Sequence, residues 1–153
     1  MATSEIRTKF DASTAFTITL ASLANGSARQ STLLTNSSNR PGALIYVRIK
    51  SGTVAPSANS VYEVYLLRSD GTITEDGAGA NDASITIENA PLLGTILVTA
   101  TTTKNFYGVF DTATLGPLGS IWGVAIKNSS GQAFSSTEAD HAVRFSYYVP
   151  EAQ

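Results

Sequence analysis

The chain has 153 residues, a formal net charge of −2, no Cys and a single His, and only 14% of its residues are charged. Because acid–base, nucleophilic and metal chemistry all need clustered titratable side chains, this inventory disfavours an enzyme or a metalloprotein and predicts no cofactor. The weak negative charge also argues against nucleic acid as a partner, so we expect a non-enzymatic protein that works through its surfaces.

The first thirteen residues are mostly polar but include Ile6, Arg7 and Phe10. We interpret residues 1–13 as an N-terminal arm that docks these three side chains on a neighbouring subunit, with a frayed terminus as the alternative. The start of the chain lacks the apolar run of a secretory signal, which favours synthesis without standard export. No stretch is long and apolar enough to span a bilayer, so a membrane is not an expected partner.

Alternating apolar and polar residues recur after the arm and predict a single β domain over residues 14–153. In the clearest case, Phe16, Ile18 and Leu20 share one face of an extended chain. Further candidate strands, rich in β-branched and aromatic residues, lie at 30–34, 43–50, 61–68, 84–87, 95–101, 105–110, 122–127 and 142–149. The pattern predicts an all-β fold, an antiparallel β-sandwich of about eight to nine strands, of jelly-roll type.

Residues 70–83, DGTITEDGAGANDA, are rich in Gly and acidic side chains and predict an exposed loop. Asp70, Glu75, Asp76 and Asp82 are weak candidates for Ca²⁺ ligands because their carboxylates supply oxygen atoms. Their spacing is not that of an EF-hand loop, which places ligands at alternate positions and a Gly at the sixth. A solvated loop without a metal is therefore the favoured interpretation.

Glu138, Asp140 and His141 lie close together in the sequence and suggest a base with an orienting carboxylate. A catalytic triad also needs a positioned nucleophile, and no G-x-S-x-G elbow is present. We expect a His that bonds to backbone groups at the start of a strand, and we assign no catalytic residue.

Four aromatic residues, Tyr107, Trp122, Tyr147 and Tyr148, can form a platform for sugar rings. Their positions in alternating runs place at least Trp122 in the core. At most one aromatic face is then left for binding.

Five stretches of the chain have a recognisable likeness: FTITLASLANGSARQST (16–32), NDASITIENAPLLGTI (81–96), FYGVF (106–110), LGPLGSIWGVAIKNSSG (115–131) and TEADHAVRFSYY (137–148). They resemble a group of small virion proteins of tailed phages, some of which look like capsid decoration or cement proteins. The likeness consists of strand and turn phrases without a catalytic signature, and no binding residue can be transferred by it. It implies a β-sandwich that assembles in many copies and joins neighbouring capsid subunits.

By this resemblance the expected partners are the major capsid protein and further copies of the chain, with a trimer as one form of homo-oligomer. The expected location is the capsid surface of the virion, after synthesis in the host cytoplasm. The alternative is a tail-fibre or receptor-binding domain that recognises carbohydrate through exposed aromatic side chains and acidic loops. An enzyme centred on His141 ranks last.

Overall fold

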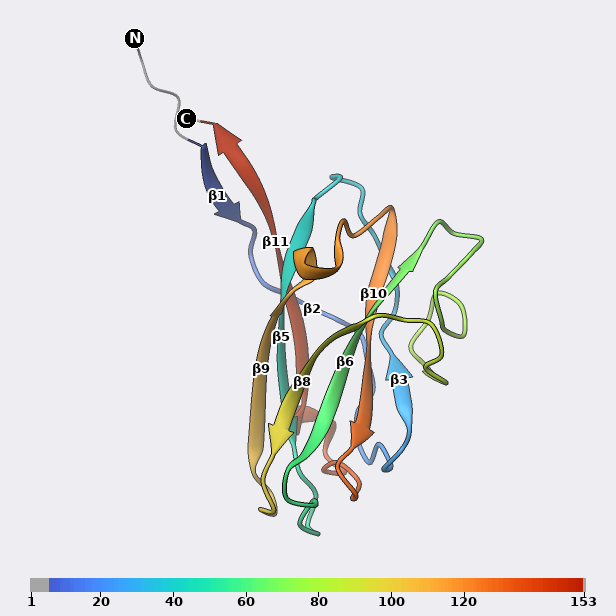
Figure 1. Ribbon diagram of the computed structural model, residues 1–153, viewed down its shortest axis with the longest axis vertical. Coiled ribbons are helices and arrows are strands. Elements are labelled where there is room, and N and C mark those ends of the chain that lie inside the picture. Colours follow the sequence, from blue (N-terminus) through green and yellow to red (C-terminus); the bar gives the residue numbers. More distant parts are fainter. Residues whose placement is uncertain (1–5, 153) are drawn as a thin grey trace.

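The computed structural model describes residues 6–152 as two antiparallel β-sheets packed face to face (Figure 1). The prediction of an all-β sandwich is confirmed, with eleven strands and two 3₁₀ helices among the described residues. No helix in this part of the chain has the length and apolarity to cross a membrane. The elements are β1 (Ile6–Phe10), β2 (Thr14–Ala15), β3 (Ala28–Gln30), β4 (Leu34–Thr35), β5 (Gly42–Lys50), β6 (Ser60–Ser69), β7 (Ala83–Ile85), β8 (Leu92–Val98), β9 (Asn105–Asp111), η1 (Thr112–Leu115), β10 (Ile121–Ser129), η2 (Glu138–Asp140) and β11 (Ala142–Ala152).

Sheet A has the strand order β1-β11-β5-β9, with β2 also pairing with β11. Sheet B has the order β7-β3-β10-β6-β8, with β4 also pairing with β10. The chain changes sheet at most of its connections, for example from β5 to β6 and from β8 to β9, so strands of the two sheets are interleaved along the sequence.

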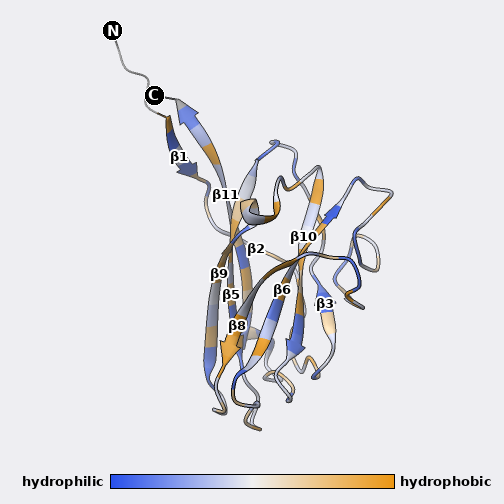
Figure 2. Cartoon of the chain, viewed as in Figure 1, coloured by the Kyte–Doolittle hydropathy of each residue, from blue (hydrophilic) through white to orange (hydrophobic). Residues whose placement is uncertain are grey.

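The core lies between the sheets because the inward residues of their strands are apolar. In β5, Ile45, Val47 and Ile49 are buried while the residues between them are half-buried and face outward, and Figure 2 shows this alternation of polar and apolar residues along the strands. Trp122 of β10 is fully buried, and its ring meets that of Phe145 edge-on at 5.3 Å. Such interlocked aromatic rings stabilise a rigid body.

The predicted strand Phe16–Leu20 is extended but pairs differently from the expectation. Phe16 and Leu20 are buried, as the alternation predicts. Phe16 donates its N–H to Val143 of sheet A, and Thr17 accepts an N–H bond from Thr32 beside sheet B. The segment therefore crosses from one sheet to the other, and a crossing segment cannot form a continuous ladder with either.

The predicted arm forms a strand within its own molecule. Residues 6–10 pair with residues 148–152 of β11, and this two-stranded ribbon extends beyond the body of the sandwich (Figure 1). We call these ten residues the terminal ribbon. The remainder of the expected docking arm, residues 1–5, lies outside the described residues.

Candidate functional site

The outer face of sheet B is covered by the chain itself. Residues 70–91, which we call the covering segment, connect β6 to β8 and include β7. Under them lies a second buried cluster of Leu67, Ala90 and Ala125, against which Leu33, Tyr65, Ile85 and Ile87 pack. The outer face of sheet B is thus a second, smaller core.

Gln30 fastens the covering segment to β3. Its side chain is fully buried, and its Nε2 donates to the carbonyl oxygens of Gly79 at 2.8 Å and Asn81 at 2.6 Å. Its Oε1 accepts the N–H of Ala78 at 2.8 Å. One side chain therefore satisfies three backbone groups of the segment.

The four acidic residues considered as Ca²⁺ ligands have separate partners. Asp70 accepts the N–H groups of its own turn, and Glu75 forms an ion pair with Arg68 at 2.7 Å. Asp82 forms an ion pair with Arg29 at 2.5 Å and accepts the hydroxyl of Thr19. Asp76 accepts the N–H groups of residues 88, 89 and 90 through one oxygen, Oδ2. The described residues include no cluster of three or more metal-ligating side chains.

These contacts shift the titration of the acidic side chains. Burial opposes ionisation of Asp76, but the N–H donors of residues 88–90 outweigh it, so its pKa is lowered. The pKa of Asp82 is lowered as well, because the bonds from Arg29 and Thr19 outweigh its burial. Both carboxylates hold the covering segment in place as anions.

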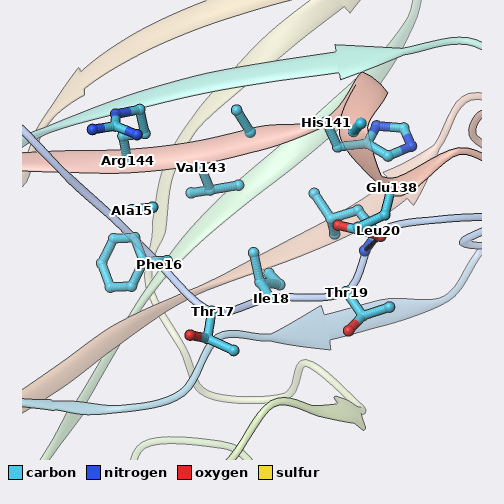
Figure 3. Close-up of a pocket in the computed structure, with 12 residues that line it drawn as sticks. Ala15, Phe16, Thr17, Ile18, Thr19, Leu20, Glu138, His141, Val143 and Arg144 are labelled. Atoms are coloured by element: carbon cyan, nitrogen blue, oxygen red, sulfur yellow. Dashed lines mark hydrogen bonds between the residues drawn. The ribbon is translucent and has the colours of Figure 1, made fainter.

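A second region, a hollow of about 410 Å³ at the edge of the sandwich, contains Glu138 and His141 (Figure 3). His141 is buried; its Nδ1 lies 3.4 Å from the N–H of Lys50 and its Nε2 lies 3.0 Å from the carbonyl oxygen of Ser135. A neutral imidazole with its proton on Nε2 satisfies both contacts. The ring thus bonds to backbone groups, in the arrangement that the sequence favoured.

The two carboxylates beside His141 also bind structural partners. Glu138 accepts the N–H groups of Leu20 at 2.9 Å and Ala21 at 2.7 Å. Asp140 accepts the hydroxyl of Ser135 at 2.6 Å and forms an ion pair with Lys50 at 3.1 Å. These residues join the crossing segment and β5 to the start of β11.

The four aromatic residues considered for sugar binding lie on different faces. Trp122 is buried and donates its Nε1–H to the Tyr147 hydroxyl at 2.9 Å. Tyr148 donates its hydroxyl to Asp111 at 2.6 Å, and burial, together with that carboxylate, raises its pKa to about 12. Only Tyr107, with 68% of its surface exposed, is a large aromatic surface open to solvent. The four residues do not form one platform, and the placement of Trp122 in the core is confirmed.

No segment within residues 6–152 covers the outer face of sheet A. Strand register places Tyr107 opposite Arg48, and Val109 opposite Tyr46, and these side chains share the outward direction because directly opposed residues lie on the same side of a sheet. The same register extends through β11 to β1. We call this surface the open face; it comprises Ile6, Phe10, Tyr46, Arg48, Tyr107, Val109 and Arg144.

The open face is notably apolar. Ile6, Phe10, Tyr107 and Val109 are between 54% and 75% exposed, and they are half of the large exposed apolar residues in the described chain. A hollow of about 270 Å³ lies among Tyr46, Arg48, Tyr107, Val109, Ala142 and Arg144. The strand register places these residues in two groups, Tyr107 and Val109 beside the hollow and Ile6 and Phe10 on the terminal ribbon. Exposed apolar surface is typical of interaction sites.

Two arginines beside this hollow bond only to neutral groups. Arg48 donates to the carbonyl oxygen of Ala139 at 2.9 Å, and its Nε is buried without an acceptor among the described residues. Arg144 donates to the hydroxyl and carbonyl oxygens of Ser13 at 3.0 and 2.8 Å. Neither forms an ion pair with a residue that the structure describes. The open face thus has uncompensated positive charge.

The terminal ribbon has one apolar face and one charged face. Phe10 packs edge-on against Tyr148, with ring centroids 5.9 Å apart, on the side of the open face. Arg7 projects to the opposite side, as does Lys9, which pairs with Glu151 at 3.2 Å. Of the predicted interface residues, Ile6 and Phe10 therefore share one face and Arg7 lies on the other.

The two edges of the terminal ribbon differ. Asp11 donates its N–H to Tyr147 at 2.8 Å; by the alternation of an antiparallel ladder, the backbone groups of Ile6, Thr8 and Phe10 then point away from β11. No described strand pairs with this outer edge of β1.

On the other side of the ribbon, β5 begins opposite Tyr148, so β11 continues beyond its partner. Pro150 is the next residue whose backbone faces that side, and it has no N–H to donate.

The sequence reasoning did not identify Tyr46, Arg48, Val109 or Arg144. For Tyr46 and Arg48 a signal is present in β5, GALIYVRIK, where large or charged side chains alternate with apolar core residues. Which of the two sheets stays uncovered was not readable from this pattern. Comparison of the chain with family models, with curated proteins and with solved structures finds no match.

Proposed function

We propose that this protein is a non-enzymatic phage virion protein of the decoration or cement type, which binds the outer capsid surface and stabilises contacts between major capsid subunits. One observation supports this most: the open face and the terminal ribbon leave apolar surface uncovered on one side, while the chain covers the equivalent face on the other side. A cement protein needs such a one-sided contact surface on a rigid body. The resemblance to tailed-phage virion proteins supplies the capsid as the partner.

We infer further that the sandwich is a jelly roll. The strand orders β2-β11-β5-β9 and β3-β10-β6-β8 support this, because the chain alternates between two four-stranded groups with antiparallel pairing throughout. Jelly rolls of two Greek keys are common in viral shells. In this proposal the protein is made in the host cytoplasm and joins the particle as part of an oligomer.

The test uses capsids assembled without the protein, to which purified full-length protein is added. We expect it to bind in many copies over the shell, seen by electron microscopy, and to raise the temperature at which particles rupture. Deleting residues 1–10 or changing Val109→Glu on the open face should reduce occupancy at least tenfold. Val54→Ser, at an exposed apolar position away from the open face, is the matched control.

Binding only at the tail would contradict the cement role and favour the alternative, a receptor-binding domain. The observation behind that alternative is Tyr107, an exposed ring at the edge of the 270 Å³ hollow, since sugars stack on such rings. Tyr107→Ser should then abolish binding to a glycan array, whereas a cement protein has no glycan ligand to lose.

A further inference from the structure

The open face has a chemical complement elsewhere on the same chain. The turn Asp70–Ile73 follows β6 of sheet B, and the sandwich separates it from the open face, so a molecule cannot join the two within itself. In Figure 1 this turn projects on the side away from the terminal ribbon. Contact between turn and open face requires two copies.

The turn is acidic, apolar and rigid. The Asp70 carboxylate accepts the N–H groups of Thr72 and Ile73, both at 2.7 Å, and Asp70 donates its own N–H to the carbonyl oxygen of Ile73. Asp70 forms no ion pair with a described residue. Beside it, the Ile73 side chain is 74% exposed, although large apolar side chains gain free energy by burial. We call these four residues the knob.

The two surfaces match in charge and polarity. The open face has two arginines around an apolar hollow, and the knob has an exposed carboxylate beside an exposed isoleucine. Within residues 6–152, neither the arginines nor the carboxylate has an oppositely charged partner. Arg48 and Arg144 donate only to neutral oxygen atoms of described residues, and an incoming carboxylate offers their guanidinium groups a charged acceptor. Because both surfaces are held by internal hydrogen bonds, little conformational entropy is lost when they meet.

We propose that the open face binds the knob of a second copy of this chain, with Asp70 at the arginines and Ile73 in the hollow. The contact is head-to-tail, because one copy contributes its face and the next its knob; such contacts form rings when the rotation between copies closes. This inference rests on the assembly role proposed above, to which it adds the neighbour that the open face recognises. The knob occupies only the part of the open face around the hollow, so Ile6 and Phe10 of the terminal ribbon, which lie further along β11, stay available for the shell.

The test measures self-association of the full-length protein in solution by sedimentation velocity, from low micromolar to high concentration. We expect wild type to associate as concentration rises. Val109→Glu places a carboxylate beside the arginines of the open face, and Asp70→Asn with Ile73→Ser removes the charge and apolar side chain of the knob. Each variant should associate at least tenfold more weakly. Val54→Glu makes the same substitution, with the same charge change, at an exposed valine outside the open face and should associate like wild type.

Mixing provides the decisive measurement. The face variant retains an intact knob, and the knob variant retains an intact face, so an equimolar mixture should form a 1:1 heterodimer that cannot grow further. Wild type that stays monomeric, a face variant that associates like wild type, or a mixture without heterodimer would each overturn the inference. If the protein binds capsids but stays monomeric, this inference is overturned and the proposed function stands. If the protein self-associates but does not bind capsids, the proposed function is overturned and this inference stands.

Discussion

The outer face of sheet B is buried and that of sheet A is exposed, although the strands of both sheets have a similar alternation of apolar and polar residues. Sheet B is covered by residues 70–91 and has Leu67 and Ala125 fully buried on its outside. Sheet A leaves Tyr107 and Val109 more than half exposed. The chain closes one face with its own loop, and among the described residues the other stays exposed; in the function proposed above, that exposed face meets a partner. Substitutions on the first should therefore change stability, and those on the second should change assembly.

Among substitutions on the covered face of sheet B, Gln30→Ala should lower the free energy of unfolding most. It removes three hydrogen bonds between a fully buried side chain and the covering segment, at a cost of about 3 kcal/mol in the free energy of unfolding. Urea unfolding measures the loss, and hydrogen exchange should show faster exchange in residues 78–90. Gln132→Ala, at a half-buried glutamine without a side-chain bond of this kind, is the control. Equal stability of the two variants would mean that the segment is held in another way.

Asp76→Ala should weaken the covering segment by about 2 kcal/mol, because the carboxylate accepts several backbone N–H groups. The pKa of Asp76 is lower in the folded protein than its ordinary value. Its stabilisation is therefore complete above about pH 4 and lost as the pH falls through the folded pKa. Unfolding measured from pH 7 down to pH 2 should show a smaller acid loss in the variant than in wild type. Parallel curves would contradict this role for Asp76.

His141→Ala tests whether the hollow lined by Glu138 and His141 contributes to function in addition to the two outer faces of the sandwich. The variant loses two contacts to backbone groups and the packing against Phe134, which should lower the free energy of unfolding by about 1–2 kcal/mol. Capsid occupancy at matched folding should remain that of wild type. A well-folded variant without function would make the hollow at His141 the functional site.

Tyr107→Ser should have the smallest effect on stability, below about 0.5 kcal/mol, because the ring is mostly in solvent already. Thermal unfolding checks this value, and sedimentation shows whether self-association weakens. Tyr62→Ser, at a fully buried tyrosine in the core, is the contrasting substitution and should unfold the protein several kcal/mol more easily. Similar melting temperatures for the two variants would contradict the assignment of Tyr107 to an open face.

The alternation of apolar and polar residues predicted most of the long strands, but it did not predict which strands pair with each other. Alternation in β5, β6 and β10 fixes which residues point inward, since a strand has a period of two. The same alternation correctly predicted that Phe16 and Leu20 are buried. That this segment crosses from one sheet to the other is seen only in the three-dimensional structure. The strands β1 and β2 were not predicted, and the predicted strand 30–34 shares only its two end residues with β3 and β4. Such short strands are stabilised by a partner distant in the sequence, which local alternation does not reveal.

Contacts between residues distant in the sequence were also missed in the acidic loop, residues 70–83. Residues 70–83 were expected to be an exposed loop, and residues 77–81 are exposed. The prediction was wrong for Glu75, Asp76 and Asp82, which are half-buried and hold the loop to the sheet. Their partners Arg68, Arg29 and the N–H groups of residues 88–90 lie 7 to 53 residues away, beyond the reach of local periodicity.

The proline in the terminal ribbon has a consequence for how strands can stack. Amyloid-like growth needs a template whose two edges both accept strands, so that each addition presents a new site. Here β1 offers unpaired N–H and C=O groups on one side, while Pro150 interrupts the donors on the other. A projecting β-ribbon is ordinarily an aggregation hazard at the high local concentrations of an assembling particle. This ribbon can accept one strand at its open edge and resists continuous fibril growth through the other.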